Sequence, residues 1–298
     1  MDIRFATTPT LEIGYLEQGP PAGDPVILLH GFPDDALAYE QVAPRLAAAG
    51  MRVLMPWLRG CGPTRFRDPA TPRSGQQAAL GADLLGFMDA LGIERAVLGG
   101  YDWGGRAACV VAALWSARVR ALVSVTGYNI QNIAAAAHPA LPVQEQRYWY
   151  QWYFQTERGR AGLQAHRAAL ARLLWQAWSP NWAFAEAGFA RTAASFDNQD
   201  FVAVVIQSYR HRYAAAPGDP AFAAIERQLA AGPPITVPTV ILHGAADQVT
   251  PAAEAAAEAA HFTGPMRRHV IARVGHFLPR EAPGVMADAV AEAMGLGG

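Results

Sequence analysis

Residues 97–108 constrain the fold most, because they combine a strand, a sharp turn and a helix in direct succession. An apolar run ends in two glycines, passes through Asp102 and enters an alanine-rich stretch through two more glycines. This order is the G-x-nucleophile-x-G pattern of a nucleophile elbow, with an aspartate at the central position. Because an aspartate between glycines is also a common turn former, the pattern needs support from the rest of the chain.

Apolar runs and helix-like segments alternate on both sides of this motif. The expected strands follow a hairpin within residues 2–18 and cover residues 26–30, 52–56, 96–99, 121–125, 239–243 and 268–272. The expected helices cover residues 36–49, 75–91 after an N-cap at Ser74, 104–115, 251–260 and 282–294. Strands that alternate with helices predict a mostly parallel sheet with helices on both faces, which is the α/β class.

Residues 134–234 break this alternation with helical segments and no convincing strand. They contain five of the eight tryptophans and five of the nine tyrosines. An aromatic helical insertion after a strand predicts a lid over the carboxyl ends of the strands, where α/β folds bind ligands. We therefore expect a core formed by residues 1–133 and 235–298, with the lid inserted between its two parts.

Charge and composition narrow the classes of partner. The chain of 298 residues has a formal net charge of −1 and no basic run, which argues against nucleic acid. No apolar run reaches membrane-spanning length, and the first residues lack a secretory signal pattern. Cys61 and Cys109 lie in apolar surroundings, which favours a reducing compartment and a cytoplasmic location. The sequence leaves a monomer and a homodimer equally open.

Two further residues follow strands of the predicted sheet. Asp247 comes after the run 239–243, and His276 comes after the run 268–272. Asp247 could instead cap a helix, and His276 could be a core histidine. Strand ends of a parallel sheet meet at one edge, so both side chains are expected beside Asp102. The other histidines are scattered without metal-ligand spacing, and no metal site is expected.

The chain at this point resembles a known family. The motifs that carry the resemblance are His30-Gly31-Phe32-Pro33, Asp102-Trp103-Gly104-Gly105, Asp247 and His276. They resemble the epoxide hydrolases of the α/β-hydrolase superfamily and their relatives, the haloalkane and haloacetate dehalogenases. The resemblance implies the α/β-hydrolase fold and a triad of Asp102, Asp247 and His276. It also implies an oxyanion hole built from the backbone N–H groups of Phe32 and Trp103.

Two lid segments extend the resemblance. Tyr150-Gln151-Trp152-Tyr153-Phe154-Gln155 and Ser208-Tyr209-Arg210 are similar to the segments that carry the ring-opening tyrosines. The resemblance therefore implies Tyr150 and Tyr209 as donors to the epoxide oxygen. Tyr148 and Tyr153 remain open for the first position and Tyr213 for the second, and either role could be packing alone.

The aromatic residues of the lid predict an apolar cavity and a neutral, apolar substrate. The expected lining residues are Trp103, Trp152, Tyr153, Tyr213 and Phe277. The elbow supports a neutral substrate, because haloacetate dehalogenases carry two arginines there and only Arg106 matches. Trp57, where the family usually has an acid, and Tyr101, where it often has histidine, are expected to reshape the floor of this cavity.

The expected reaction follows from an aspartate nucleophile. A carboxylate with a pKa of about 4 is ionised at neutral pH and attacks an sp³ carbon without a base. His276, oriented by Asp247, would then activate water to hydrolyse the alkyl–enzyme ester. The product of an epoxide is a vicinal diol, and the reaction requires no metal or organic cofactor.

Three alternatives are weighed against an epoxide hydrolase. A dehalogenase would use the same triad and release a halide, and it is the second choice. A non-catalytic receptor would be expected to lose part of the triad, whereas every member is present. An ordinary esterase is disfavoured, because Asp102 would form an anhydride rather than an acyl-serine.

Overall fold

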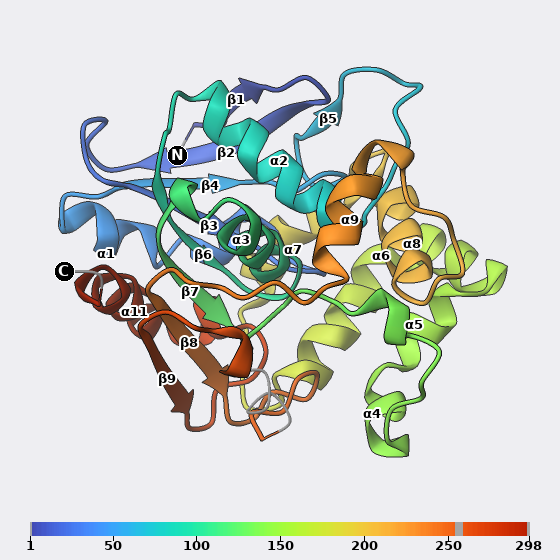
Figure 1. Cartoon of the computed structure of the whole chain (residues 1–298). Helices are drawn as coiled ribbons and strands as arrows, with labels where there is room; N and C mark the ends of the chain where they lie inside the picture. Colours follow the sequence, from blue (N-terminus) through green and yellow to red (C-terminus); the bar gives the residue numbers. More distant parts are fainter. Residues whose placement is uncertain (1, 254–258, 297–298) are drawn as a thin grey trace.

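The computed structural model describes residues 2–253 and 259–296, and a largely parallel sheet runs through its centre (Figure 1). The strands are β1 (Arg4–Thr7), β2 (Leu11–Gln18), β3 (Pro25–Leu29), β4 (Arg52–Pro56), β5 (Arg65–Phe66), β6 (Ala96–Gly100), β7 (Val119–Val125), β8 (Thr239–Gly244) and β9 (Met266–Ile271). The α-helices are α1 (Ala43–Ala48), α2 (Gln77–Ala90), α3 (Asp102–Leu114), α4 (Pro142–Arg147), α5 (Trp149–Phe154), α6 (Glu157–Trp178), α7 (Glu186–Ala193), α8 (Phe201–Arg212), α9 (Ala223–Leu229), α10 (Leu278–Glu281) and α11 (Pro283–Gly295).

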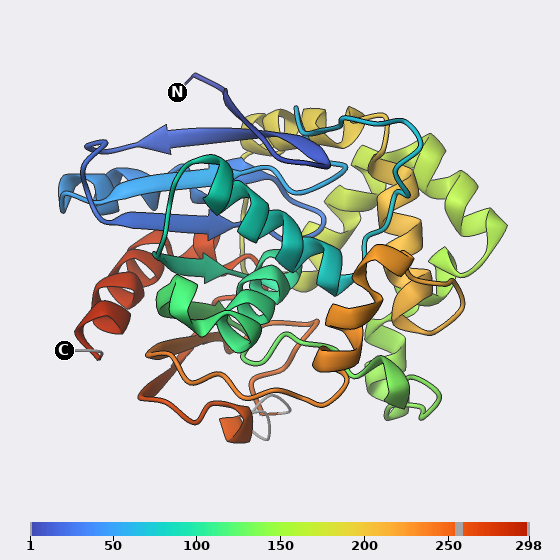
Figure 2. The same ribbon diagram turned by 45° about the horizontal axis from the view of Figure 1, so that its top comes forward.

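The sheet has the strand order β1-β2-β4-β3-β6-β7-β8-β9, and β5 pairs with β2. The strands from β4 to β9 along this order pair in parallel, whereas β2 pairs antiparallel with β1, β4 and β5. Helices α2 and α3 pack together on one face, and α1 and α11 pack together on the other (Figures 1 and 2). Strands covered on both faces need apolar side chains throughout, which explains the continuous apolar runs. The predicted α/β-hydrolase fold is confirmed.

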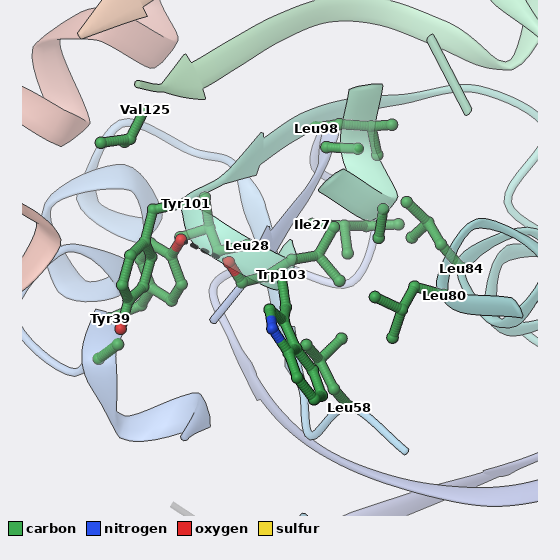
Figure 3. Close-up of a cluster of buried hydrophobic side chains, with 14 of the residues drawn as sticks. Ile27, Leu28, Tyr39, Leu58, Leu80, Leu84, Leu98, Tyr101, Trp103 and Val125 are labelled. Atoms are coloured by element: carbon green, nitrogen blue, oxygen red, sulfur yellow. Dashed lines mark hydrogen bonds between the residues drawn. The ribbon is translucent and has the colours of Figure 1, made fainter. Parts of the chain in front are cut away.

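The core beneath the strand ends is tightly packed. Figure 3 shows Ile27 and Leu98, from the neighbouring strands β3 and β6, close to Leu80 and Leu84 of α2. All four side chains are at most 2% exposed. Burial of each such side chain contributes about 1.5–3 kcal/mol to the stability of the fold. This packing therefore stabilises the strands that carry the site.

Helices α4 to α9 lie between β7 and β8 and gather at one end of the sheet (Figures 1 and 2). This segment, in which every residue is described, contains no strand, as the sequence predicts. Buried polar contacts join it to the core, because Asp35 accepts hydrogen bonds from Ser195 Oγ at 2.7 Å and Thr192 Oγ1 at 3.1 Å. Its limits at residues 134 and 234 stay a prediction.

Some predicted helix boundaries are wrong. Ser74 does not cap α2, which begins at Gln77 after an extended Gln76 that makes no capping hydrogen bond. The Ser74 hydroxyl instead bonds to the side chain of Gln76 at 2.8 Å. The helix expected at 104–115 begins two residues earlier, at Asp102 itself.

One further predicted helix is split. The one expected at 36–49 is divided into a 3-10 turn at Ala36–Tyr39 and α1, whereas the closing helix expected at 282–294 is confirmed as α11 and is preceded by the short α10. The helix expected at 251–260 lies largely outside the described residues. Among the described residues, no helix is long and apolar enough to cross a membrane.

Candidate active site

Asp102 is the first residue of α3 and follows β6 directly. Its φ of 49° lies in the left-handed region, which costs a residue other than glycine about 1–3 kcal/mol. The turn is tight because a Cβ at Gly104 would overlap the carbonyl oxygen of Leu29. Glycine at this position lets the helix begin against β3. The strand–turn–helix expected from the sequence is therefore present, with a strained Asp102 at its apex.

The loop after β3 packs against Asp102. The backbone N–H of Phe32 donates to Asp102 Oδ1 at 2.8 Å, and a Cβ at Gly31 would lie 2.6 Å from Asp102 Cβ. Trp103 is in the first turn of α3, where backbone N–H groups have no partner one turn earlier. Both groups proposed for the oxyanion hole thus come from segments that frame the same carboxylate.

Asp247 and His276 form a buried pair. His276 Nδ1 lies 2.9 Å from Asp247 Oδ2, and the two residues are 1% and 3% exposed, respectively. Asp247 Oδ1 accepts the N–H groups of Val249 and Thr250 at 2.6 and 3.0 Å, which fixes the carboxylate. Burial lowers the pKa of His276, but the carboxylates of Asp247, Asp102 and Glu281 together raise it, with Asp247 first among them, so the net shift is upward. His276 Nε2 has no hydrogen-bond partner among the described residues and remains available as a base.

Tyr150 of α5 and Tyr209 of α8 face one another with ring centroids 5.5 Å apart. The Tyr150 hydroxyl accepts a hydrogen bond from Gln151 Nε2 at 2.8 Å. The Tyr209 hydroxyl has no partner among the described residues. Burial raises the pKa of both phenols, and Asp102 raises that of Tyr209 further. Both tyrosines are therefore protonated at neutral pH and able to donate.

A cavity of about 480 Å³ joins these elements. Asp102, His276 and Tyr150 lie in its wall, and Tyr209 is buried beside Trp103, with ring centroids 5.9 Å apart. The remaining wall is mixed. Its polar members include Thr126, Asn129, Gln131, Asn132, Gln151, Arg106 and Arg212, and its apolar members include Ile130, Leu229 and Val249. The apolar cavity predicted from the aromatic content of the lid is therefore wrong in part.

Most of the aromatic residues predicted for the wall lie elsewhere. Tyr213 lines the cavity, and its hydroxyl donates to Gln151 Oε1 at 2.8 Å. Trp152 does not, because its indole points to the surface and donates to Glu145 at 2.9 Å. Phe277 is fully buried behind His276. Tyr153 packs beside Trp149 instead.

Trp103 also lies outside the wall of this cavity. Its indole packs between Phe32, at 5.6 Å between ring centroids, and Tyr209. Trp57 and Tyr101, the two departures from the family pattern, do not form the cavity floor. They bond to the buried carboxylates of Asp35 and Asp34, respectively.

Sequence reasoning noted Arg106 only as the single match to the two elbow arginines of the haloacetate dehalogenases, and it assigned no role to Arg212. Arg106 lies four residues after Asp102 on α3, and Arg212 lies three residues after Tyr209 on α8. Residues three or four apart share a helix face, so this spacing was the available signal. Among the described residues, no group of three His, Cys, Asp or Glu side chains could hold a metal ion.

Known proteins resemble both the sequence and the fold. Residues 24–283 match the family model of the alpha/beta hydrolase fold. Epoxide hydrolase A of Mycobacterium tuberculosis is 34% identical over 139 residues, which are 47% of this chain and 39% of that protein. A haloalkane dehalogenase of Mycobacterium marinum is 33% identical over 132 residues, or 43% of this chain and 42% of that protein. The chain thus matches about two fifths of the length of these relatives.

A crystal structure extends the similarity to nearly the whole chain. The protein described as a "putative epoxide hydrolase" from Klebsiella pneumoniae subsp. pneumoniae MGH 78578 is 46% identical, with a TM-score of 0.96. The match covers 98% of this chain and 97% of that one. The chain therefore belongs to the α/β-hydrolase fold family, among relatives that include epoxide hydrolases and a haloalkane dehalogenase.

Proposed function

We propose that this protein is an epoxide hydrolase that forms a covalent ester on Asp102. The observation that carries the proposal is the arrangement around the Asp102 carboxylate. One of its oxygens accepts the Phe32 N–H, and the cavity that it lines also holds His276 and Tyr150. Epoxide hydrolases among the relatives support the same reaction. The substrates are a small epoxide and water.

In the first step an Asp102 oxygen attacks an epoxide carbon and breaks its bond to the ring oxygen. The ring oxygen then takes a proton from Tyr209 or Tyr150, and a phenolate remains. The Tyr209 hydroxyl has no hydrogen-bond partner among the described residues, whereas the Tyr150 hydroxyl accepts one from Gln151, so Tyr209 is the less engaged of the two donors. The strained backbone of Asp102 holds the carboxylate forward for this attack.

In the second step His276 Nε2 removes a proton from water, and the water oxygen attacks the carbonyl carbon of the Asp102 ester. The Phe32 and Trp103 N–H groups stabilise the negative charge that develops on the carbonyl oxygen, at about 3 kcal/mol for each donor. The alkoxide leaves with the proton from His276, which completes the diol. The Asp102 carboxylic acid then returns a proton to the tyrosine phenolate, so every atom and charge is recovered.

A hydrolytic dehalogenase is the second candidate, and one observation favours it. The Trp103 indole Nε1 is buried without a hydrogen-bond partner among the described residues, and it directly follows Asp102, which makes it the candidate donor to a departing halide. A haloalkane dehalogenase is also among the relatives. The tyrosine pair favours the epoxide, since a halide leaves without a proton whereas a ring oxygen needs one. A panel of epoxides and haloalkanes scored for diol and halide separates the two.

The decisive experiment traps the ester. In His276→Gln, styrene oxide is expected to add its own mass to the protein and to stay bound, because the second step lacks its base. Intact mass spectrometry measures the adduct, and peptide mapping is expected to place it on Asp102. His269→Gln is the matched control, because His269 pairs with Glu292 on the surface, away from the cavity. If the wild type is active and the His276→Gln variant carries no adduct, the two-step scheme is refuted.

A cytoplasmic location of the protein stays a prediction.

A further inference from the structure

Arg106 is an unusual residue for the wall of a cavity. It is only 6% exposed, and it lies one helical turn beyond Asp102. Among the described residues its side chain makes a single hydrogen bond, a long one from Nε to the carbonyl oxygen of Asn129 at 3.4 Å, and it forms no ion pair. A buried cation without an anionic partner is costly to maintain, so such a group points to a charged ligand.

Arg212 lines the same cavity from the lid and is held by neutral groups. Its Nη1 donates to Gln151 Oε1 at 2.9 Å, and the guanidinium lies 4.8 Å from the ring centroid of Tyr209. With its amide oriented to suit its neighbours, Gln131 accepts from Arg212 Nε at 2.6 Å. These contacts fix the guanidinium in place, but none of them neutralises its charge.

The charges of the wall do not balance. Among the described lining residues, Asp102 is the one carboxylate against the guanidiniums of Arg106 and Arg212. Burial and the nearby charge of Arg212 lower the pKa of Arg106 to about 10, which leaves it cationic at neutral pH. Formation of the ester removes the charge of Asp102. The tyrosine phenolate that remains after ring opening then carries the one negative charge, so the wall keeps an excess of one positive charge.

We propose that the substrate is an epoxide that carries a carboxylate, bound by Arg106 and Arg212. This inference depends on the proposed epoxide opening at Asp102 and names the class of its substrate. A single carboxylate supplies the one negative charge that the wall lacks, and it keeps that charge throughout both steps. Guanidinium groups also match the planar, two-oxygen geometry of a carboxylate. The neutral substrate expected from Trp103 and the lid aromatics is thereby replaced.

The test compares two substrates that differ only in charge. They are trans-3-phenylglycidate and its amide, 3-phenylglycidamide, and the measurement is kcat/KM for diol formation. The wild type is expected to prefer the carboxylate by about 10- to 100-fold, the worth of hydrogen bonds to a charged group. Arg106→Met is expected to lose about tenfold of this preference, and Arg212→Gln is expected to weaken it as well.

Arg210→Met is the matched control. Arg210 lies on α8 beside Tyr209, but its guanidinium bonds to Glu157 and to the Phe154 carbonyl oxygen instead of lining the cavity. The preference is expected to survive this change. Because the preference is a ratio within one variant, partial loss of active protein does not alter it.

Three results would overturn the inference. In the first, the wild type prefers the amide. In the second, Arg106→Met slows both substrates equally, which would show that the cation assists the chemistry rather than recognises the substrate. The third concerns binding, and it is needed if neither epoxide yields a diol. The proposed reaction then fails, and the carboxylate site is tested by measuring affinity instead. Asp102→Asn titrated calorimetrically with 3-phenylpropionate and its amide should bind the acid more tightly, in a manner that depends on Arg106. Equal binding of the two compounds would reject the carboxylate site.

Discussion

Arg280 and Arg106 are both buried beside the triad, yet their surroundings are opposite. Arg280 Nη2 lies 2.6 Å from Asp34 Oδ1, its Nε lies 2.8 Å from Asp34 Oδ2, and its guanidinium lies 4.9 Å from the ring centroid of Trp175. Arg106 has one long bond to a carbonyl oxygen. A buried charge with every partner in place serves the fold, whereas one whose partner is missing points to a ligand.

The position of each arginine agrees with this division. Arg280 lies four residues after His276, and Asp34 lies two residues after Phe32. Their ion pair therefore joins the loop that contacts Asp102 to the segment that follows His276. Arg106 joins no two segments in this way. We expect its loss to affect the substrate and the loss of Arg280 to affect the whole site.

The largest expected effect is the loss of stability in Arg280→Met. The change leaves the carboxylates of Asp34 and Asp35 buried without their cation, at a cost of about 3–5 kcal/mol. Urea unfolding followed by tryptophan fluorescence measures it. Arg191→Met, which breaks the exposed pair with Glu40, is the control and should change stability by less than about 1 kcal/mol. Equal losses in the two variants would contradict the structural role of the buried pair.

Asp35 provides a second test of the same cluster, through pH. Burial and the neighbouring Asp34 raise the pKa of Asp35 from 3.8 to about 6. The folded protein thus holds this proton more tightly than the unfolded chain does. Its contribution to stability is complete below pH 3.8 and is lost as pH rises to about 6, by about 2–3 kcal/mol. The difference between wild type and Asp35→Asn in urea unfolding should fall over this window and stay level above it. A flat difference would contradict the shift.

The pKa of His276 depends on the charge of Asp102. The raised pKa of His276 means that the protonated form, which cannot act as a base, persists above pH 6.5, so the rate of ester hydrolysis should already fall above that pH as the solution is acidified. The carboxylate of Asp102 contributes to the upward shift and is neutral in the ester. The acid limb of ester hydrolysis in single turnovers should therefore lie below the pH at which His276 titrates in the free enzyme, followed by NMR of its imidazole. Coincident values would place Asp102 too far from His276 to act with it.

The smallest expected effect is on the stability of Arg106→Met. Replacing a buried cation that lacks an anionic partner by an apolar side chain of similar length should change the free energy of unfolding by about 1 kcal/mol or less. Urea unfolding of this variant beside Arg280→Met is the direct measurement. A loss as large as that of Arg280→Met would end the contrast between the two arginines and assign Arg106 to the fold.

The meeting of Asp102, Asp247 and His276 could be predicted from sequence because each of them follows a strand. Asp102, Asp247 and His276 come after β6, β8 and β9, and parallel strands bring their carboxyl ends to one edge. A local pattern is enough to place such residues, because the parallel sheet itself brings them together. The pairing of Arg280 with Asp34 spans 246 positions and leaves no local trace, so nothing in the sequence distinguishes it from a surface arginine.

The lid shows where composition stops being informative. Its tyrosines and tryptophans indicated a helical cover but not which faces meet the cavity. Tyr150 and Trp152 are two residues apart on α5 and therefore point to opposite sides of the helix, one into the site and one to the surface. The polar part of the wall likewise includes Asn129, Gln131 and Gln151, which carry no motif.

The two bonds from Thr192 and Ser195 to Asp35 have a consequence for cooperativity. If the helical lid separated from the sheet, the Asp35 carboxylate would lose both of these hydrogen bonds at once. The lid and the sheet are therefore expected to melt as one unit, with a single calorimetric transition whose enthalpy equals the van't Hoff value. The α/β core and the helical lid would then unfold thermally as a single domain.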